Sequence, residues 1–260
     1  MTDLVSLPLD WRLPANLRDQ VALVVGGSSG IGLAIARELA RCGCRVAIAS
    51  RTAANGANAA GDSAAGALAA FACDIRSGAE VASLFERVVA QFGTIDLVIH
   101  SAGIGRGSES RGLPQPVARL SEAEWQAMMD TNLRGAFFVA RAAGKLMRRL
   151  GRGQILNISS ARGARRGLPL AAPYCAAKMA VLTMFQSLAE ELQPFGVRVW
   201  SLLPDAVATS LIANTSLARR GSLSAAGLAS VVVYFLGLAW DAQVLDPVVE
   251  PFEYLAGGVA

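Results

Sequence analysis

Short apolar runs recur along this chain of 260 residues, and longer stretches with helical periodicity separate them. The runs are nearly continuous in apolar residues, which is typical of strands buried on both faces, as in a parallel sheet. Their alternation with helices predicts an α/β fold, a single doubly wound (Rossmann) sheet that is mainly parallel, seven-stranded and covered by helices on both faces. The expected strands cover residues 21–25, 45–49, 68–72, 95–99, 154–158, 197–203 and 247–252.

Helices are expected between the strands, over residues 31–41, 77–92, 121–150, 174–193 and 222–240. Ser77 and Ser121 each stand three residues before a glutamate, a spacing that predicts a capping box at a helix N-terminus. The length fits one large domain, since single α/β domains often reach about 250 residues. We therefore expect one domain over residues 19–260, preceded by an extension over residues 1–18.

The composition argues against several classes of protein. Hydrophobic residues make up 53% of the chain and charged residues 17%, so the chain is not of a disordered type. The net charge of +4 comes from scattered residues, which gives no indication of nucleic-acid binding. Four cysteines without metal-ligand spacing and a single histidine, His100, argue against a metal site. Residues 1–18 lack a signal-peptide pattern, so we expect a cytoplasmic protein with reduced thiols.

A charge-free stretch of nineteen residues, 222–240, allows two interpretations. Its length approaches the roughly 20 residues that span a bilayer. Serines and glycines interrupt it, and only residues 231–238 are strongly apolar. A buried helix is the favoured interpretation, and a membrane segment is the alternative.

A glycine-rich turn follows the first expected strand and opens the first expected helix. Glycines let the backbone approach a pyrophosphate, while the N–H groups and the dipole of the helix attract the anion. This context predicts nucleotide binding, and a plain turn is the alternative. The predicted contacts are Gly26, Ser28, Ser29, Gly30, Ile31 and Gly32.

The end of the second expected strand bears on which nucleotide binds. A carboxylate there would bind the ribose hydroxyls of NAD, whereas an arginine accommodates the 2′-phosphate of NADP. The chain has Ser50 and Arg51 at this point, and a guanidinium pairs well with phosphate. We therefore expect NADP(H), with NAD(H) less favoured, unless Arg51 is an ordinary surface residue.

Tyr174 and Lys178 are four positions apart, on one face of an expected helix. A free tyrosine, with a pKa of about 10, is a poor acid or base at neutral pH, and a neighbouring ammonium lowers that pKa. Lys145 and Lys178 are the only lysines among 24 basic residues, so a lysine at this position is notable. The pair indicates proton transfer, and a chance pairing is the alternative.

Further motifs follow the same order along the chain. They are Asp74 after the third strand, Ala102-Gly103 after the fourth, Asn132 in the long helix, Asn157 to Ser160 after the fifth, and Pro204 with Thr209 after the sixth. With the glycine turn and the Tyr174/Lys178 pair, they resemble the short-chain dehydrogenase/reductase family over about residues 18–210.

The resemblance implies roles for these residues. Tyr174 would exchange a proton with a substrate oxygen as the nicotinamide transfers hydride, and Ser160 would hydrogen-bond that oxygen. Lys178 would bind the nicotinamide ribose and lower the tyrosine pKa, and Asn132 would hold a water that relays protons to Lys178. The implied cofactor contacts are Asp74, Ile75, Ser101, Ala102, Gly103, Tyr174, Lys178, Pro204, Val207 and Thr209.

The chain departs from the family pattern before and within the catalytic segment. His100 and Ser101 replace two asparagines, and His100 is interpreted as structural rather than as a base. Ser160 and Tyr174 are fourteen positions apart, one more than usual. The spacing predicts a bulge in the loop or a shift of the serine, with Ser159 as the fallback.

Charged residues raise a further question near the expected substrate site. Asp205 follows Pro204, where the family usually has glycine, and a carboxylate near the nicotinamide would favour the oxidised ring. A solvent-facing Asp205 is the favoured interpretation. Arg162, Arg165 and Arg166 would suit an acidic substrate or a carrier protein, but solvated surface is again favoured.

The favoured function is an NADPH-dependent oxidoreductase that reduces a small-molecule ketone or other carbonyl to an alcohol, or runs the reverse reaction. The alternative is a family member that binds NADP with little turnover and acts as a binding or regulatory module, since His100, Ser101 and Asp205 depart from the pattern. A membrane-associated enzyme is a third possibility. Residues 205–224 and 104–120 are expected to close the substrate pocket. The resemblance also implies a homodimer or homotetramer, without nucleic-acid partners.

Overall fold

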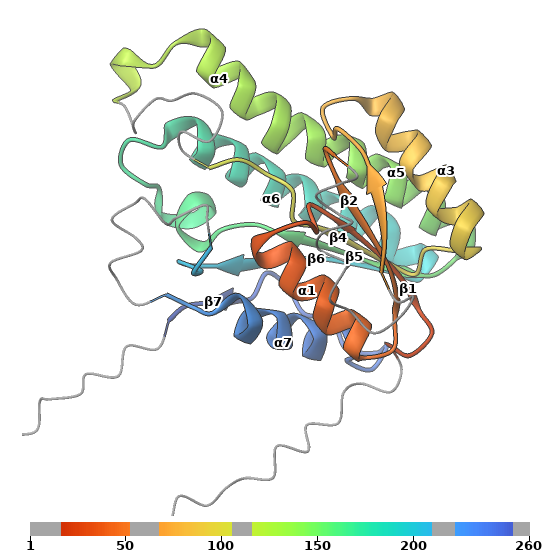
Figure 1. Ribbon diagram of the computed structural model, residues 1–260. Helices are drawn as coiled ribbons and strands as arrows, with labels where there is room; N and C mark the ends of the chain where they lie inside the picture. The colour runs from red at the N-terminus through yellow and green to blue at the C-terminus, as the bar shows by residue number, and fades with distance from the viewer. Residues whose placement is uncertain (1–16, 53–67, 106–115, 210–221, 252–260) are drawn as a thin grey trace, which may run out of the picture.

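A single parallel sheet of seven strands lies at the centre of the protein, with strand order β3-β2-β1-β4-β5-β6-β7. The computed structural model describes residues 17–52, 68–105, 116–209 and 222–251 (Figure 1). All six strand pairings are parallel, so the expected fold class is confirmed. The strands are β1 (Val21–Val25), β2 (Arg45–Ser50), β3 (Leu68–Ala72), β4 (Leu97–His100), β5 (Gly153–Ile158), β6 (Val197–Pro204) and β7 (Val248–Val249).

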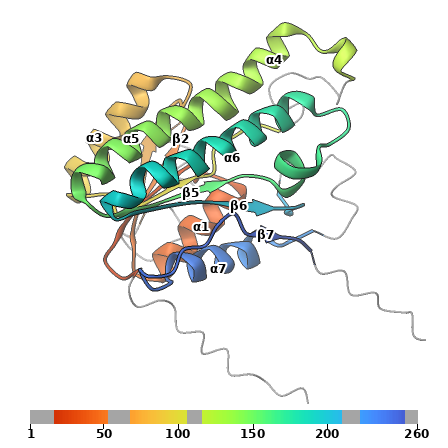
Figure 2. The ribbon, with the colours of Figure 1, turned by 180° about the vertical axis from the view of Figure 1, so that it is seen from behind.

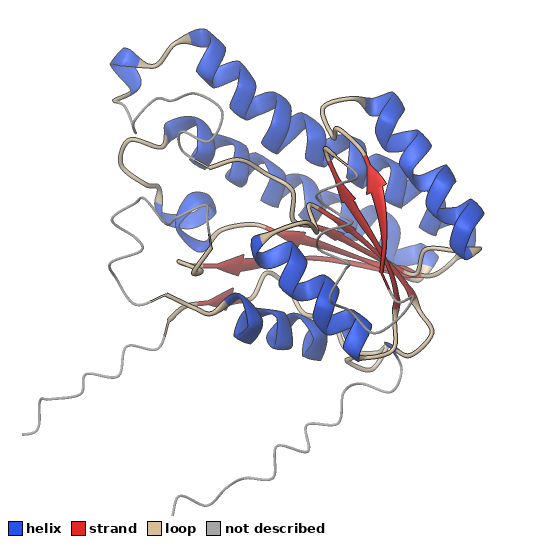
Figure 3. Cartoon of the chain, viewed as in Figure 1, coloured by secondary structure: helices blue, strands red, loops and turns tan. Residues whose placement is uncertain are grey.

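Helices cover both faces of this sheet (Figures 1 and 2). One face is covered by α3 (Gly78–Phe92), α5 (Gly135–Leu150) and α6 (Ala172–Leu192), and the other by α1 (Gly30–Arg41) and α7 (Ala225–Leu236). Figure 3 shows the strands between these two layers. The carboxyl ends of the parallel strands therefore meet at one edge, where the loops that follow them lie together.

The central strands are buried on both faces, which explains their continuous apolar runs. In β1, Val21, Leu23 and Val25 pack into the cluster beneath α3, α5 and α6. Ala22 and Val24, on the opposite face of the same strand, pack into the cluster beneath α1 and α7. Burial on both sides makes the register of β1 strongly specified, because a slip by one residue would exchange the two sets.

The described part of the chain begins inside the second of these clusters. Leu17 is fully buried there, and its carbonyl accepts a hydrogen bond from Cys44 Sγ. The rest of the expected extension lies outside the described residues, apart from Arg18. Residues 106–115 and 210–221, which belong to the two expected pocket loops, also lie outside them.

The charge-free stretch forms α7, a helix of 12 residues that begins after the N-cap Ser224. Its buried side chains, among them Leu228, Val232 and Leu236, pack in the cluster that α1 also covers. Among the residues described, no helix combines the length and the apolar character that crossing a bilayer requires. The favoured interpretation, a buried helix, is therefore confirmed over Ala225–Leu236.

The expected long helix over residues 121–150 is divided by a wider turn. Its pieces are α4 (Glu122–Met128), a π-helical turn over Met129–Arg134 and α5. The capping box at Ser121 is present, with both reciprocal hydrogen bonds to Glu124. At Ser77 only half of the box forms, because the Glu80 carboxylate accepts the N–H of Asp74 instead.

Candidate active site

Two adjoining cavities open along the carboxyl edge of the sheet, the edge at which open α/β sheets bind ligands. The larger, of about 310 Å³, lies over the ends of β1, β2, β3 and β4. The smaller, of about 130 Å³, is lined by the segments after β4, β5 and β6 and by the start of α6. Both are lined by Ile31, Ser101, Gly103, Ile104 and Thr209.

The residues predicted from the sequence gather in these cavities, with two exceptions. Gly32 is buried beneath the glycine turn, and Asn132 lines neither cavity. The larger cavity is lined by Gly26, Ser28, Ser29, Gly30, Ile31, Arg51, Asp74, Ile75, Ser101, Ala102, Gly103 and Thr209. The smaller is lined by Ser160, Tyr174, Lys178, Pro204 and Val207, together with the fallback Ser159.

The glycine turn is shaped to let a ligand approach the backbone. Gly26 has a φ of +84°, and a Cβ there would lie 2.5 Å from the Ala102 nitrogen. Ser29 is the N-cap of α1, and its side chain makes no capping hydrogen bond. The first N–H groups of a helix have no partner within the helix, so they can bind an anion. These features suit the pyrophosphate of a dinucleotide.

Three charged side chains, Arg51, Asp74 and Arg76, line the larger cavity near the ends of β2 and β3. Arg76 pairs with Asp74 at 2.6 Å, and this hydrogen bond is the main reason that the pKa of Asp74 is lowered. Arg51, at the end of β2, also lowers the pKa of Asp74 through its charge. The sequence analysis did not single out Arg76, although it stands two residues after Asp74 in the segment that follows β3.

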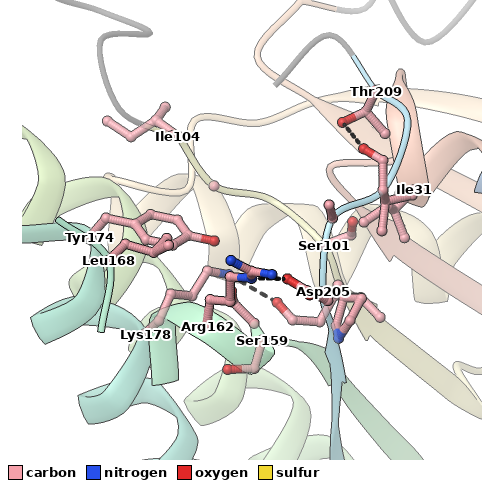
Figure 4. A pocket seen from close by; sticks show the side chains of 17 residues that line it. Ile31, Ser101, Ile104, Ser159, Arg162, Leu168, Tyr174, Lys178, Asp205 and Thr209 are labelled. Carbon is pink, nitrogen blue, oxygen red and sulfur yellow. Dashed lines mark hydrogen bonds and ion pairs between the residues drawn. The ribbon is translucent and has the colours of Figure 1, made fainter. Parts of the chain in front are cut away.

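Helix α6 brings the expected proton-transfer pair to the smaller cavity. Pro173 lies in the first turn of the helix, and Tyr174 follows it. Lys178 Nζ donates a hydrogen bond to the Ile158 carbonyl at 2.9 Å and lies 5.9 Å from the centre of the Tyr174 ring. Figure 4 shows the Tyr174 hydroxyl directed into the space between these segments. Burial lowers the pKa of Lys178 to about 8.

Ser160 lies beside Tyr174 despite the additional residue between them. The chain takes a π-helical turn over Arg162–Arg166, and the wider turn accommodates the extra residue, so the expected bulge is present. Gly163 donates its N–H to Ser160 Oγ at 3.0 Å. A Cβ on Gly163 would lie 3.1 Å from Ser160 Oγ and 2.7 Å from Tyr174 Cε1, so both side chains flank this glycine.

Asn132 holds the segment after β4 rather than facing the cavities. Its Oδ1 accepts the Ile104 N–H at 2.7 Å, and its Nδ2 donates to the Ile104 carbonyl at 2.8 Å. Nδ2 also contacts Met128 Sδ at 2.9 Å. The side chain is therefore engaged on both sides, and a water held by this residue stays a prediction.

His100 lies in the core at the end of β4. It is 3% exposed, it stacks on Phe185 with 6.4 Å between ring centroids, and burial lowers its pKa to about 3. The ring is therefore neutral near pH 7, and its Nδ1 has no hydrogen-bond partner among the described residues. This placement favours a structural histidine over a base.

The expectation that Asp205 faces solvent is wrong. Its side chain is only 9% exposed, and its Oδ1 accepts a hydrogen bond from Arg162 Nε at 2.7 Å. The Arg162 side chain is 30% exposed, and it lines the smaller cavity together with Asp205. Arg165 and Arg166 are exposed, as expected, and Arg166 pairs with Glu250 at the surface.

The lowered pKa of Lys178 predicts a pH dependence of stability. The amine has a pKa of about 8 in the folded protein and an ordinary value of 10.5 when unfolded. Between these values the unfolded chain binds more protons, so the free energy of unfolding rises with pH across this window and is flat below it. We expect wild type to gain on the order of 2 kcal/mol relative to Lys178→Met between pH 8 and 10.5.

Denaturant unfolding of both proteins at each pH measures this difference. If the difference in free energy of unfolding between wild type and Lys178→Met did not change with pH, Lys178 would have its ordinary pKa in the folded protein.

The fold and the motifs agree with comparisons to known proteins. The family model for short chain dehydrogenase matches residues 20–220. A D-threitol dehydrogenase of Mycolicibacterium smegmatis is 37% identical over 211 residues, which cover 80% of this chain and 76% of the relative. A 3-oxoacyl-[acyl-carrier-protein] reductase of Synechocystis sp. is 35% identical over 201 residues, which cover 76% of this chain and 78% of the relative.

A solved structure supports the same assignment. The crystal structure of a 3-ketoacyl-(acyl-carrier-protein) reductase from Brucella melitensis, complexed with NADH, superimposes with a TM-score of 0.81 and 30% sequence identity. The match covers 90% of this chain and 98% of that one. The chain therefore belongs to the short-chain dehydrogenase family, as its motifs indicated. It is an oxidoreductase of that family, and its cleft suits a nicotinamide cofactor.

Proposed function

We propose that this protein interconverts a small-molecule ketone and the corresponding alcohol, using NADP(H) and Tyr174 as the general acid and base. The observation behind the proposal is the meeting of Ser160, Tyr174 and Lys178 in a cavity that adjoins the one over the glycine turn. Two relatives support carbonyl and alcohol chemistry by their names, a threitol dehydrogenase and a 3-oxoacyl reductase.

Each residue has a separate task in this reaction. A bound nicotinamide supplies hydride for reduction or accepts it during oxidation. Tyr174 donates a proton to the substrate oxygen during reduction and removes it during oxidation. Ser160 donates a hydrogen bond to the same oxygen and stabilises its developing charge. Lys178 holds the nicotinamide ribose and places a positive charge near the phenol, fixed in position by Ile158.

The proposed preference for NADP(H) depends on Arg51. No carboxylate follows β2 at this point, and Arg51 lines the larger cavity near Asp74 and Arg76. Because a guanidinium pairs with the 2′-phosphate, we expect Arg51→Ala to weaken NADPH binding by roughly 10- to 100-fold. NADH binding should change by less than about threefold, since NADH lacks that phosphate.

Fluorescence titration of both cofactors checks this expectation, with Arg37→Ala as a control for loss of an exposed arginine elsewhere. Equal weakening of NADPH and NADH would contradict a phosphate-binding role for Arg51. Tighter binding of NADH than of NADPH by wild type would contradict the proposed preference.

Steady-state assays test the reaction itself, with a panel of ketones and secondary alcohols and both cofactors. Turnover of at least one ketone or alcohol with either cofactor would support the proposed oxidoreductase activity. Tight cofactor binding without turnover across the panel would favour the alternative, a binding or regulatory module.

We also propose a homodimer or homotetramer that packs through the helices bearing Asn132 and Tyr174, in one domain over residues 19–260 of a cytoplasmic protein. Large apolar side chains are exposed on these helices: Trp125 is 41% exposed, Phe137 43% and Met179 47%. Sedimentation measures the oligomeric state.

A further inference from the structure

The smaller cavity contains an ion pair that the proposed reaction does not use. Asp205 comes directly after β6, and Arg162 opens the π-helical turn after β5. Figure 4 shows Arg162 and Asp205 meeting beside Tyr174 and Lys178. The pair therefore lies in the wall of the same cavity as the residues assigned to the reaction.

Asp205 is held in place from two sides. Its N–H donates to the Val249 carbonyl at 2.9 Å, which ties its backbone to β7. Its Oδ1 accepts from Arg162 Nε at 2.7 Å, which fixes the side chain. Because both the backbone and the carboxylate of Asp205 are fixed, the side chain keeps its direction when a ligand arrives, which is what specific recognition of a polar group needs.

The carboxylate keeps capacity to accept further hydrogen bonds. A carboxylate has about four lone-pair sites, and within the described part of the chain only Arg162 donates to it. The side chain is 9% exposed in a cavity whose other walls include Ile31, Ile104 and Leu168. A ligand that fills this cavity removes water from Asp205, so an apolar ligand would leave the carboxylate without replacement donors.

These features distinguish between kinds of substrate. An anionic group would meet the Asp205 carboxylate at close range, and the arginine that would attract it is already paired with Asp205. A purely apolar ketone offers Asp205 no donor. A neutral compound with hydroxyl groups next to the reacting carbon offers O–H donors to Asp205 and presents no charge.

We propose that Asp205, held by Arg162, accepts a hydrogen bond from a substrate hydroxyl and makes this protein selective for neutral polyhydroxylated substrates, the polyols and their hydroxyketones. This inference rests on the proposed alcohol and ketone interconversion. It assigns Asp205 to binding and specificity, and Arg162 to positioning Asp205.

The test compares two four-carbon alcohols that share a secondary hydroxyl but differ in its neighbours. The tetritols threitol and erythritol have hydroxyls on all four carbons, whereas butan-2-ol has no hydroxyl next to the reacting carbon. We expect kcat/KM of wild type to be roughly 100-fold higher for a tetritol, as a hydrogen bond to a charged group would give. Asp205→Asn should lower kcat/KM for the tetritol by roughly 10- to 100-fold and change that for butan-2-ol by less than about threefold.

Calorimetric titration of the tetritol into protein saturated with reduced cofactor gives a second readout, because this pair has no hydride acceptor and measures binding without turnover. Arg166→Gln is the matched control, since this exposed arginine belongs to the same turn but pairs with Glu250. Arg166→Gln should leave kcat/KM for both alcohols and the affinity for the tetritol unchanged.

The outcomes separate this inference from the proposed function. Equal kcat/KM of wild type for the tetritol and butan-2-ol, or equal losses for both in Asp205→Asn, would overturn the inference while the reaction stands. Tetritol binding that depends on Asp205 without any turnover would support the inference and contradict the reaction. A tetritol that neither binds nor reacts would overturn the inference, whatever the activity on other ketones.

Discussion

Replacement of Tyr174 by phenylalanine is expected to lower kcat/KM by roughly 1,000-fold in both directions of the reaction, the usual contribution of a positioned general acid or base. The phenol is the group that exchanges a proton with the substrate oxygen, and phenylalanine keeps the ring while removing that proton. The ring packs against Gly163, and this contact is retained. Cofactor binding should therefore change by only about threefold or less.

Steady-state kinetics with the best substrate of the panel, together with a cofactor titration, measures the two effects. Tyr234→Phe is a matched control, because Tyr234 is 50% exposed on α7, away from both cavities. Near-normal turnover by Tyr174→Phe would remove Tyr174 from the chemistry and with it the proposed mechanism.

The second large effect is expected at the glycine turn, where Gly26→Ala should both destabilise the protein and weaken cofactor binding by roughly 100-fold or more. The positive φ of +84° is unfavourable for alanine, at about 1 kcal/mol. The new methyl group would also meet the Ala102 backbone at 2.5 Å, which forces β1 and β4 apart at their ends. Such overpacking typically costs about 1–3 kcal/mol more.

Gly93→Ala separates these two causes. Gly93 has nearly the same φ, +86°, but no atom lies within 4 Å of the position that a Cβ would take. It should lose only about 1 kcal/mol of unfolding free energy and bind the cofactor normally. Equal losses for the two variants in denaturant unfolding would show that the contact with Ala102 does not matter. Normal cofactor affinity in Gly26→Ala would contradict the role of the turn in binding.

The sequence was sufficient to predict the features that depend on local pattern. Continuous apolar runs predicted buried parallel strands, and the β1–turn–α1 context predicted nucleotide binding at the glycine turn. The spacing of Tyr174 and Lys178 paired those two side chains. That Ser160 would join them came from the family resemblance and not from local pattern.

Features that depend on distant partners were not predictable in this way. Arg162 and Asp205 are 43 positions apart, and each is a charged residue in the segment after a strand, a context typical of exposed residues. Only the wider turn after β5 and the register of β6 bring them together. The division of the helix around Asn132, and the use of its side chain to hold Ile104, likewise depend on packing that leaves no local signal.

The shortest strand of the sheet has a consequence for how this enzyme could diverge. β7 lies at one edge of the sheet, and its Val249 carbonyl accepts the N–H of Asp205, which lines the smaller cavity. Under the proposals made above, substrate selectivity depends on a residue anchored to this edge strand, whereas proton transfer depends on Tyr174 in α6. Substitutions around β7 would then change the preferred substrate and leave the residues of proton transfer undisturbed.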